Sequence, residues 1–215
     1  MSDQPLGTTP SAAAPSAECK RMLDIIRREC PGLVPAEPLD PGGVAPEVPV
    51  PLPAVQDLFI TAALFAVGLL DDDGRPVGEA VVWAEHDREL LVLVTKIRVR
   101  VVPGVVAVTI PVRCEEIGDT EVHVTFAVGS PDRPAGLLLA TEERPRGPQL
   151  VVDLWGEALV AFAWKLLLDV SAHVAFAAGD DKDGQRLVPA ALTADKTGIV
   201  VLPQARHTFD RVIRP

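Results

Sequence analysis

The longest apolar stretch of the chain runs from Asp153 to Ala178, and its polar residues recur with a helical spacing. Successive polar positions are four or eight residues apart, which places them on one narrow stripe of an α-helix. The stripe consists of Asp153, Glu157, Lys165, Asp169 and His173. Prolines precede the stretch and Gly179 follows it, as is typical of a helix with a defined start and end. Because nearly every other position is apolar, the pattern predicts a helix that other elements surround, at the centre of the fold.

Much of the rest of the chain predicts strands, because short segments rich in β-branched residues alternate with turn residues. The apolar run 55–70 is interpreted as a strand that enters a hairpin through Asp71–Gly74. The further strands are expected at 79–85, 90–102, 105–113, 121–128, 136–141, 186–192 and 198–202. The meander should be antiparallel, with one face on the core and one in solvent.

These elements predict an α+β fold. It is an antiparallel β-meander, either a sheet or a partly closed barrel, packed around one long buried central helix. The expected organisation is a disordered tail at 1–15, a short amphipathic helix at 16–30, a proline-rich linker at 31–53 and a single domain at 54–215. Eight prolines make the linker an extended, semi-rigid tether for the short helix. That helix either docks on another chain or packs on its own domain, and both interpretations stay open.

The composition narrows the class of protein. The chain has 215 residues and a net charge of −10, so it is repelled by nucleic-acid phosphates and anionic membranes unless a basic patch intervenes. An odd number of cysteines, three, without a CxxC pair favours a reducing, cytoplasmic setting over a disulfide framework or a zinc site. No signal-peptide pattern opens the chain. The charges along the apolar helix oppose a membrane span, because each would cost about 2.5–3.5 kcal/mol near a bilayer centre.

Two groups of residues are weak candidates for catalysis. Glu85, His86 and Asp87 combine two carboxylates with an imidazole, which suits acid–base work or metal binding but is also common in a polar hairpin loop. Cys114 would need a base such as His86 or His123 to act as a nucleophile, and an isolated cysteine at a strand end is more often a small hydrophobe. We expect no metal and no cofactor. The DDKDG segment at 180–184 fails the calcium-loop spacing and is interpreted as a turn.

A basic stripe is the best candidate for binding anions. Its residues are Lys96, Arg98 and Arg100, with Arg113 beside them if the strands pair as expected. The alternative is a solvated sheet face whose basic residues pair with Glu121 and neighbouring acids across strands.

The function that the sequence favours is a non-catalytic interaction or assembly protein, forming a homo-oligomer or a multi-chain complex. More apolar surface is present than one sheet and one helix easily bury, and exposed apolar patches usually mark interfaces. The residues expected to contact partners are Met22, Leu23, Ile25, Ile26, Leu58, Phe59 and Phe65. An enzyme using Glu85, His86, Asp87, Cys114 and His123 is the first alternative, and a nucleic-acid adaptor using the basic stripe is the second. Protein partners are expected, membrane association is not, and nucleic acid is disfavoured.

Overall fold

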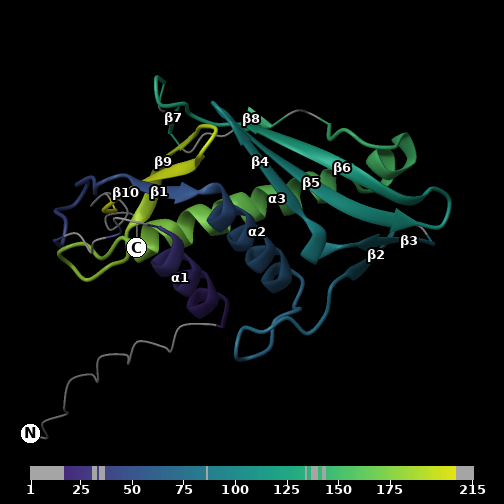
Figure 1. Ribbon diagram of the computed structural model, residues 1–215, viewed down its shortest axis with the longest axis horizontal. Coiled ribbons are helices and arrows are strands. Elements are labelled where there is room, and N and C mark those ends of the chain that lie inside the picture. Colours follow the sequence, from purple (N-terminus) through teal and green to yellow (C-terminus); the bar gives the residue numbers. More distant parts are fainter. Residues whose placement is uncertain are drawn as a thin grey trace, which may run out of the picture.

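The computed structural model describes residues 17–30, 33, 37–85, 87–133, 135–136, 140–141 and 144–206. Over these residues the chain forms helices and two antiparallel sheets, so the α+β class is confirmed, and neither sheet closes into a barrel (Figure 1). The helices are α1 (Ala17–Glu29), α2 (Leu52–Ala66) and α3 (Gln149–Ala177), with a 3-10 turn η1 (Val94–Lys96). The strands are β1 (Val48–Pro51), β2 (Val81–Glu85), β3 (Arg88–Val92), β4 (Arg98–Val102), β5 (Val105–Cys114), β6 (Gly118–Ala127), β7 (Ala135–Gly136), β8 (Ala140–Thr141), β9 (Val188–Ala194) and β10 (Gly198–Gln204).

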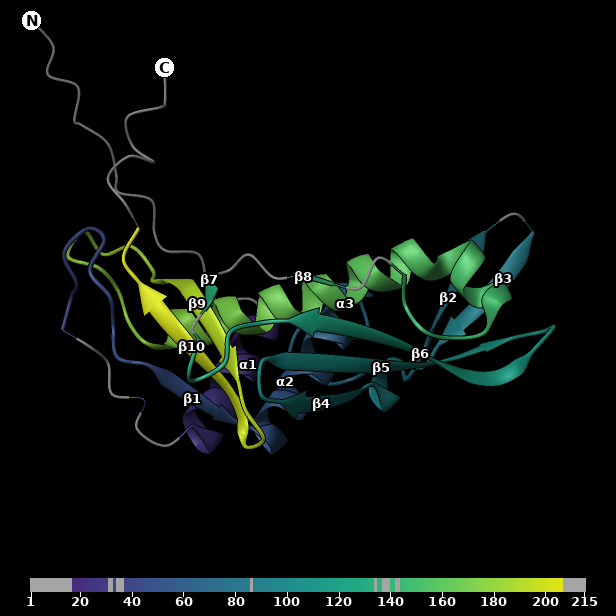
Figure 2. The same ribbon diagram turned by 90° about the horizontal axis from the view of Figure 1, so that it is seen from above.

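Helix α3 is the expected central helix, and it runs along both sheets (Figure 2). Its apolar faces pack on α1, α2, β6, β9 and β10, and side chains such as Leu159, Leu166 and Val170 are fully buried. The polar stripe lies outward, with Asp153, Glu157 and Lys165 exposed. The helix starts four residues before the expected Asp153, directly after Pro148. The i+4 spacing therefore located both the helix and its solvent-facing side.

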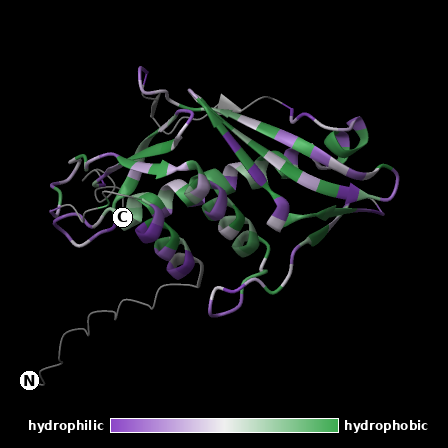
Figure 3. Ribbon diagram, viewed as in Figure 1, coloured by the Kyte–Doolittle hydropathy of each residue, from purple (hydrophilic) through white to green (hydrophobic). Residues whose placement is uncertain are grey.

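The larger sheet has the strand order β2-β3-β5-β6-β8, and β4 also pairs with β5. Along β5 and β6, alternate side chains such as Val108, Ile110 and Val124 are buried. In Figure 3 hydrophobic and hydrophilic colours alternate along these strands. The strand expected at 90–102 is interrupted by η1. Leu90 pairs with Cys114 of β5 and Arg98 pairs with Thr109, so a segment that advances eight residues lies opposite one that advances only five, and the surplus residues form the turn. The expected strand at 136–141 appears as β7 and β8, which join different sheets, and residues 137–139 lie outside the described residues.

Gln56 of α2 covers the free edge of β4 beside this interruption. Its side-chain Nε2 donates to the Ile97 carbonyl (2.6 Å), and its Oε1 accepts from the Val99 N–H (2.8 Å). The amide thus takes the place that a neighbouring strand would have. Helix α2 and β4 are joined by hydrogen bonds as well as by apolar packing.

The strand expected at 55–70 is wrong, because this run forms α2. The run lacks the period-2 alternation of a half-buried strand, and residues on several sides of the helix are buried by α1, α3 and β4. Pro53 lies in the first turn, where proline is tolerated, and Gly68 adopts φ 72° just after the end. A continuous apolar run of this length is compatible with either element, and here the flanking proline and glycine mark a helix.

Helix α1 packs on its own chain, against α2 and α3. Met22 and Ile26 are fully buried, and Arg21 donates from Nε to Thr61 Oγ1 (3.2 Å) and from Nη1 to the Gly74 carbonyl (2.8 Å). Packing on the same domain is therefore the arrangement that the structure has. The disordered tail expected at 1–15 lies outside the described residues.

Part of the proline-rich segment is a strand. β1 is an edge strand of the second sheet, whose order is β1-β10-β9-β7. The Leu52 N–H donates to the Thr197 carbonyl (2.9 Å). Every second residue of a strand directs its backbone groups at the same neighbour, so Val50 and Val48 direct theirs at β10. Pro49 and Pro51 occupy the outward positions, where no N–H is needed. The packed body therefore includes α1 and β1.

Candidate functional site

A groove runs along the solvent-facing side of α3, between this helix and the segment that leads into it. We call it the α3 groove; its volume is about 570 Å³. It is lined by Arg144, Pro145, Val152, Asp153, Leu154, Gly156, Glu157, Val160, Ala161 and Trp164. From Val152 to Trp164 the helix rises about 18 Å, the length of roughly five residues of extended chain.

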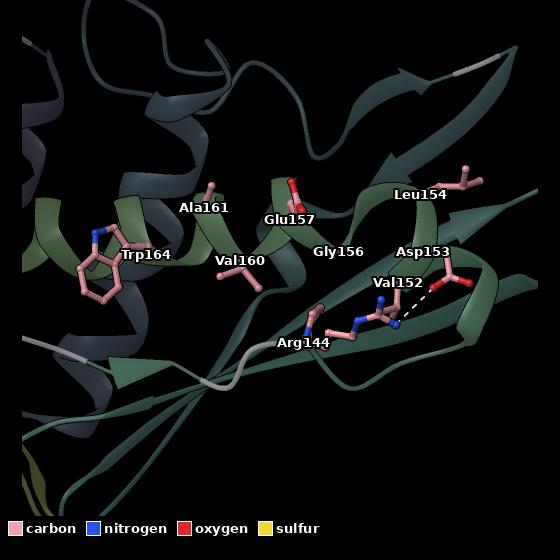
Figure 4. A pocket seen from close by; sticks show the side chains of 10 residues that line it. Arg144, Val152, Asp153, Leu154, Gly156, Glu157, Val160, Ala161 and Trp164 are labelled. Carbon is pink, nitrogen blue, oxygen red and sulfur yellow. Dashed lines mark ion pairs between the residues drawn. The ribbon is translucent and has the colours of Figure 1, made fainter.

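Two adjacent rows of α3, each with a spacing of four residues, build the groove. The apolar row consists of Val152, Gly156, Val160 and Trp164. The second row has Asp153, Glu157 and Ala161, which are all exposed. In Figure 4, Val160 and Trp164 project toward the side of Arg144, whereas Glu157 and Ala161 project from another side of the helix. A bound chain can therefore place apolar side chains against one row and polar groups against the other.

Small residues and a proline hold the incoming segment close to the helix. A Cβ on Gly156 would lie 3.5 Å from Cδ and Cγ of the buried Pro145. Because Gly156 has no side chain, Pro145 lies close over the helix there, and the small Ala161 leaves room at the exposed rim of the groove.

Electrostatics divide the groove into a neutralised end and an acidic centre. Arg144 Nη1 lies 3.7 Å from Asp153 Oδ1 (Figure 4). Gln149 Nε2 donates to the same oxygen (2.7 Å). Glu157, one turn further along, is exposed and has no ion pair with any other described residue. Beyond the groove, Lys165 pairs with Asp169 on the same helix. The Glu157 carboxylate is therefore available to a cationic group of a ligand.

The structure does not bring Cys114 and His123 together. Cys114 is buried and faces the core, whereas His123 is exposed on the other face of the sheet, with Nδ1 3.0 Å from Thr109 Oγ1. Thr109, the cross-strand partner of His123, is five residues from Cys114, or roughly 17 Å along β5. Glu85 ends β2 and Asp87 lies in the hairpin turn with φ 61°, as the polar-loop interpretation expects. His86 lies outside the described residues.

The basic residues of the candidate anion site face acids. Arg98 Nη2 bonds Glu121 Oε1 (2.6 Å), the pairing that the solvated-face interpretation expects. Arg113 donates to both carboxylate oxygens of Asp119 (2.5 and 2.9 Å), and this hydrogen bond lowers the pKa of Asp119. Lys96 in η1 and Arg113 line a shallow hollow of about 230 Å³ together with Asp119 and Glu121. Arg100 lies on the same exposed face of β4. The stripe is thus interleaved with carboxylates.

The residues expected to contact partners are mostly inside this chain's own core. Those buried there are Met22, Leu23, Ile25, Ile26, Leu58 and Phe59. Phe65, near the end of α2, is 41% exposed and remains accessible. The apolar surface that sequence reasoning assigned to partners is therefore largely used by α1 and α2 in closing the core.

Two further observations concern metals and membranes. No cluster of three or more His, Cys, Asp or Glu side chains within the described ranges could hold a metal ion. Helix α3 is long and apolar enough to cross a bilayer by length and composition, and half of its most apolar window is buried inside the protein.

The α3 groove was not found from the sequence, although part of its signal is there. The two neighbouring rows of α3 can be read from the i+4 spacing, and Gly156 and Ala161 mark a place where the helix has little side chain. Arg144 and Pro145 lie outside the helix, and only the fold brings them beside it.

Comparison of the chain with protein-family models, with curated proteins and with solved structures finds no match in any of the three.

Proposed function

We propose that this protein is a non-catalytic interaction protein that assembles with other chains by holding a short extended segment of a partner in the α3 groove. The observation that carries the proposal is the pairing of an apolar row with an acidic row along one accessible length of helix. Ligand sites are typically concave and mostly apolar, with few polar groups that orient the ligand. The groove is concave, and it combines apolar lining residues with three charged ones that could orient a ligand.

The groove suggests the chemistry of the segment. Its length accommodates about five extended residues. Val160 and the half-buried Trp164 favour apolar side chains, and an exposed tryptophan face also binds a guanidinium or ammonium group. Glu157 favours a Lys or Arg in the same segment. The partner is therefore a chain with two or three apolar residues next to a basic one.

A substitution at the exposed rim separates binding from folding. Ala161→Trp fills the groove, whereas Ala172→Trp places the same side chain on an exposed position of the same helix outside the groove. Random heptapeptides displayed on phage are selected against the wild-type protein, and the enriched peptides are synthesised and titrated by fluorescence anisotropy. We expect peptides that combine apolar and basic residues, weakened at least ~10-fold by Ala161→Trp, which corresponds to about 1.4 kcal/mol of lost contact.

The contribution of the Glu157 carboxylate to binding is tested in the same assay. Glu157→Lys should weaken the selected peptides several-fold, and less so at 1 M salt, because exposed charge pairs are screened. Glu47→Lys, another exposed acid reversed outside the groove, is the control. Peptides that bind Ala161→Trp and Ala172→Trp with equal affinity, or a selection that enriches no peptide, would contradict the proposal.

A further inference from the structure

Strand β2 ends the larger sheet and has an open backbone edge, which we call the β2 edge (Figure 1). The Leu93 N–H donates to the Pro111 carbonyl on β5. Because backbone groups of successive residues point to opposite edges of a strand, those of Leu91 are also directed at β5, and those of Leu90 and Val92 are directed at β2. Their partners on β2 are Trp83 and Val81. Val82 lies between these two residues and Ala84 follows Trp83, so the N–H and C=O groups of Val82 and Ala84 point away from the sheet.

Among the described residues, the edges of β1, β4 and β6 each have a different device that blocks pairing at part of the strand. The edge of β1 has prolines at its outward positions, and that of β4 is occupied by the side chain of Gln56. On β6, His123 exchanges two backbone hydrogen bonds with Arg146. Prolines, charges and covering segments are the usual protection of an edge against pairing. Val82 and Ala84 are themselves neither proline nor charged, and no hydrogen bond from another described segment occupies their outward backbone groups.

The β2 edge is anchored to α3 on its inner face and has an apolar residue on its outer face. Trp83 packs edge-on against Phe162 of α3, with ring centroids 5.5 Å apart, and this holds β2 in place. Val82 is 53% exposed on the other face, beside Leu91 in the next strand. A second pocket, of about 510 Å³, lies over these residues at the tips of the β2–β3 and β5–β6 hairpins.

Acidic residues surround this edge. Asp87, Glu89, Glu115 and Glu116 line the second pocket, and of its two arginines Arg88 pairs with Glu116 (3.4 Å). The other arginine, Arg113, is the one held by Asp119. Glu79 lies just before β2. Both ends of the strand therefore present negative charge.

We propose that the β2 edge accepts an extended strand of a partner protein, one with alternating apolar residues and a Lys or Arg at each end. The added strand would hydrogen-bond to Val82 and Ala84, as in recognition by strand addition. A second copy of this chain fits less well, because an antiparallel pairing of two β2 strands sets Glu79 of one copy against the acidic hairpin of the other, and like charges directly opposite destabilise strand pairs.

The experiment uses the full chain and a fluorescein-labelled probe peptide, Lys-Thr-Val-Thr-Val-Thr-Lys, measured by fluorescence anisotropy at low salt. Ala84→Pro removes an outward N–H without removing a bond to β3, and Ala84→Val keeps the N–H at the same exposed position. We expect Ala84→Pro to weaken the probe at least ~10-fold and Ala84→Val to change its affinity less than ~2-fold. The peptide Glu-Thr-Val-Thr-Val-Thr-Glu should bind at least ~10-fold more weakly than the basic probe, with the difference shrinking in salt.

A measurement on the unmodified protein does not depend on how the proline variant folds. N-methylation of alternate residues of the probe blocks one backbone edge, so one methylated series should lose binding and the complementary series should keep it. Equal binding of both series, equal binding to Ala84→Pro and Ala84→Val, or no binding at millimolar peptide would overturn the proposal. So would a homodimer in sedimentation that Ala84→Pro dissociates, because the occupant is then a second copy. Ala161→Trp should leave the probe's affinity unchanged, which separates this site from the α3 groove.

Discussion

Replacing Gln56 with leucine tests whether a single side chain secures the edge of β4. The substitution keeps much of the volume of the side chain but removes the donor to Ile97 and the acceptor for Val99. Ile97 is 1% exposed and Val99 8%, so the two backbone groups are poorly placed to bind water instead. Each unsatisfied buried group costs about 1–3 kcal/mol. Because Gln56 itself is half-buried and water can enter in part, we expect a total loss of about 2–4 kcal/mol.

Urea unfolding followed by circular dichroism measures this loss, and Gln56→Glu supplies the matched control. A carboxylate still accepts from the Val99 N–H but cannot donate to the Ile97 carbonyl, so its cost should be intermediate at pH 7. Protonation restores a donor, and Gln56→Glu should therefore recover stability relative to the wild type as the pH falls through the carboxyl pKa. A cost below about 0.5 kcal/mol for Gln56→Leu would refute the reasoning, since that is within the range of neutral surface changes.

Three further outcomes follow from burial. A chain that starts at Pro53 lacks α1 and β1, including the buried Met22, Ile26 and Val50, and should lose more than about 3 kcal/mol of stability or fail to unfold cooperatively in urea. Trp155→Ala should cost about 3–5 kcal/mol because Trp155 is 3% exposed, whereas Trp164→Ala should cost clearly less in the same assay because one side of its ring lies open in the groove. Burial raises the pKa of the Cys30 thiol from 9.0 to about 11, so this group stabilises the fold below pH 9 and loses its contribution as the pH rises to 11. By pH 10 the free energy of unfolding should have fallen by about 1.4 kcal/mol through this thiol, and Cys30→Ala should remove that part of the pH dependence.

The sequence predicted the elements whose spacing of polar and apolar residues depends on that element alone. In α3, the i+4 spacing of polar residues is a property of the helix alone, and it identified both the element and its exposed side. The alternation around Val122 and Val124 did the same for β6. Helix α2 was mistaken for a strand because burial on several sides erases the periodicity that separates the two elements.

Features that depend on two distant segments were not predictable in this way. The turn η1 exists because β3 and β4 are both aligned on β5, and nothing between Leu90 and Arg98 marks the surplus residues as a turn. The association of Arg144 with Asp153 requires the segment before α3 to fold back beside it. For α1, the amphipathic pattern predicted an apolar face but could not say which chain would cover it.

The pairing of β1 with β10 has a consequence for when the protein can fold. Val48 lies opposite Val201, about 150 residues later in the chain. At translation rates of about 5–20 residues per second, β1 waits roughly 8–30 s on the ribosome before its partner strand is made. During that interval the backbone edge that it will present to β10 stays unpaired and the sheet beside α3 is incomplete. The second sheet therefore cannot be completed until β10 has been made, and the prolines at 49 and 51 remove two donors from the waiting strand that could otherwise pair with a neighbouring nascent chain.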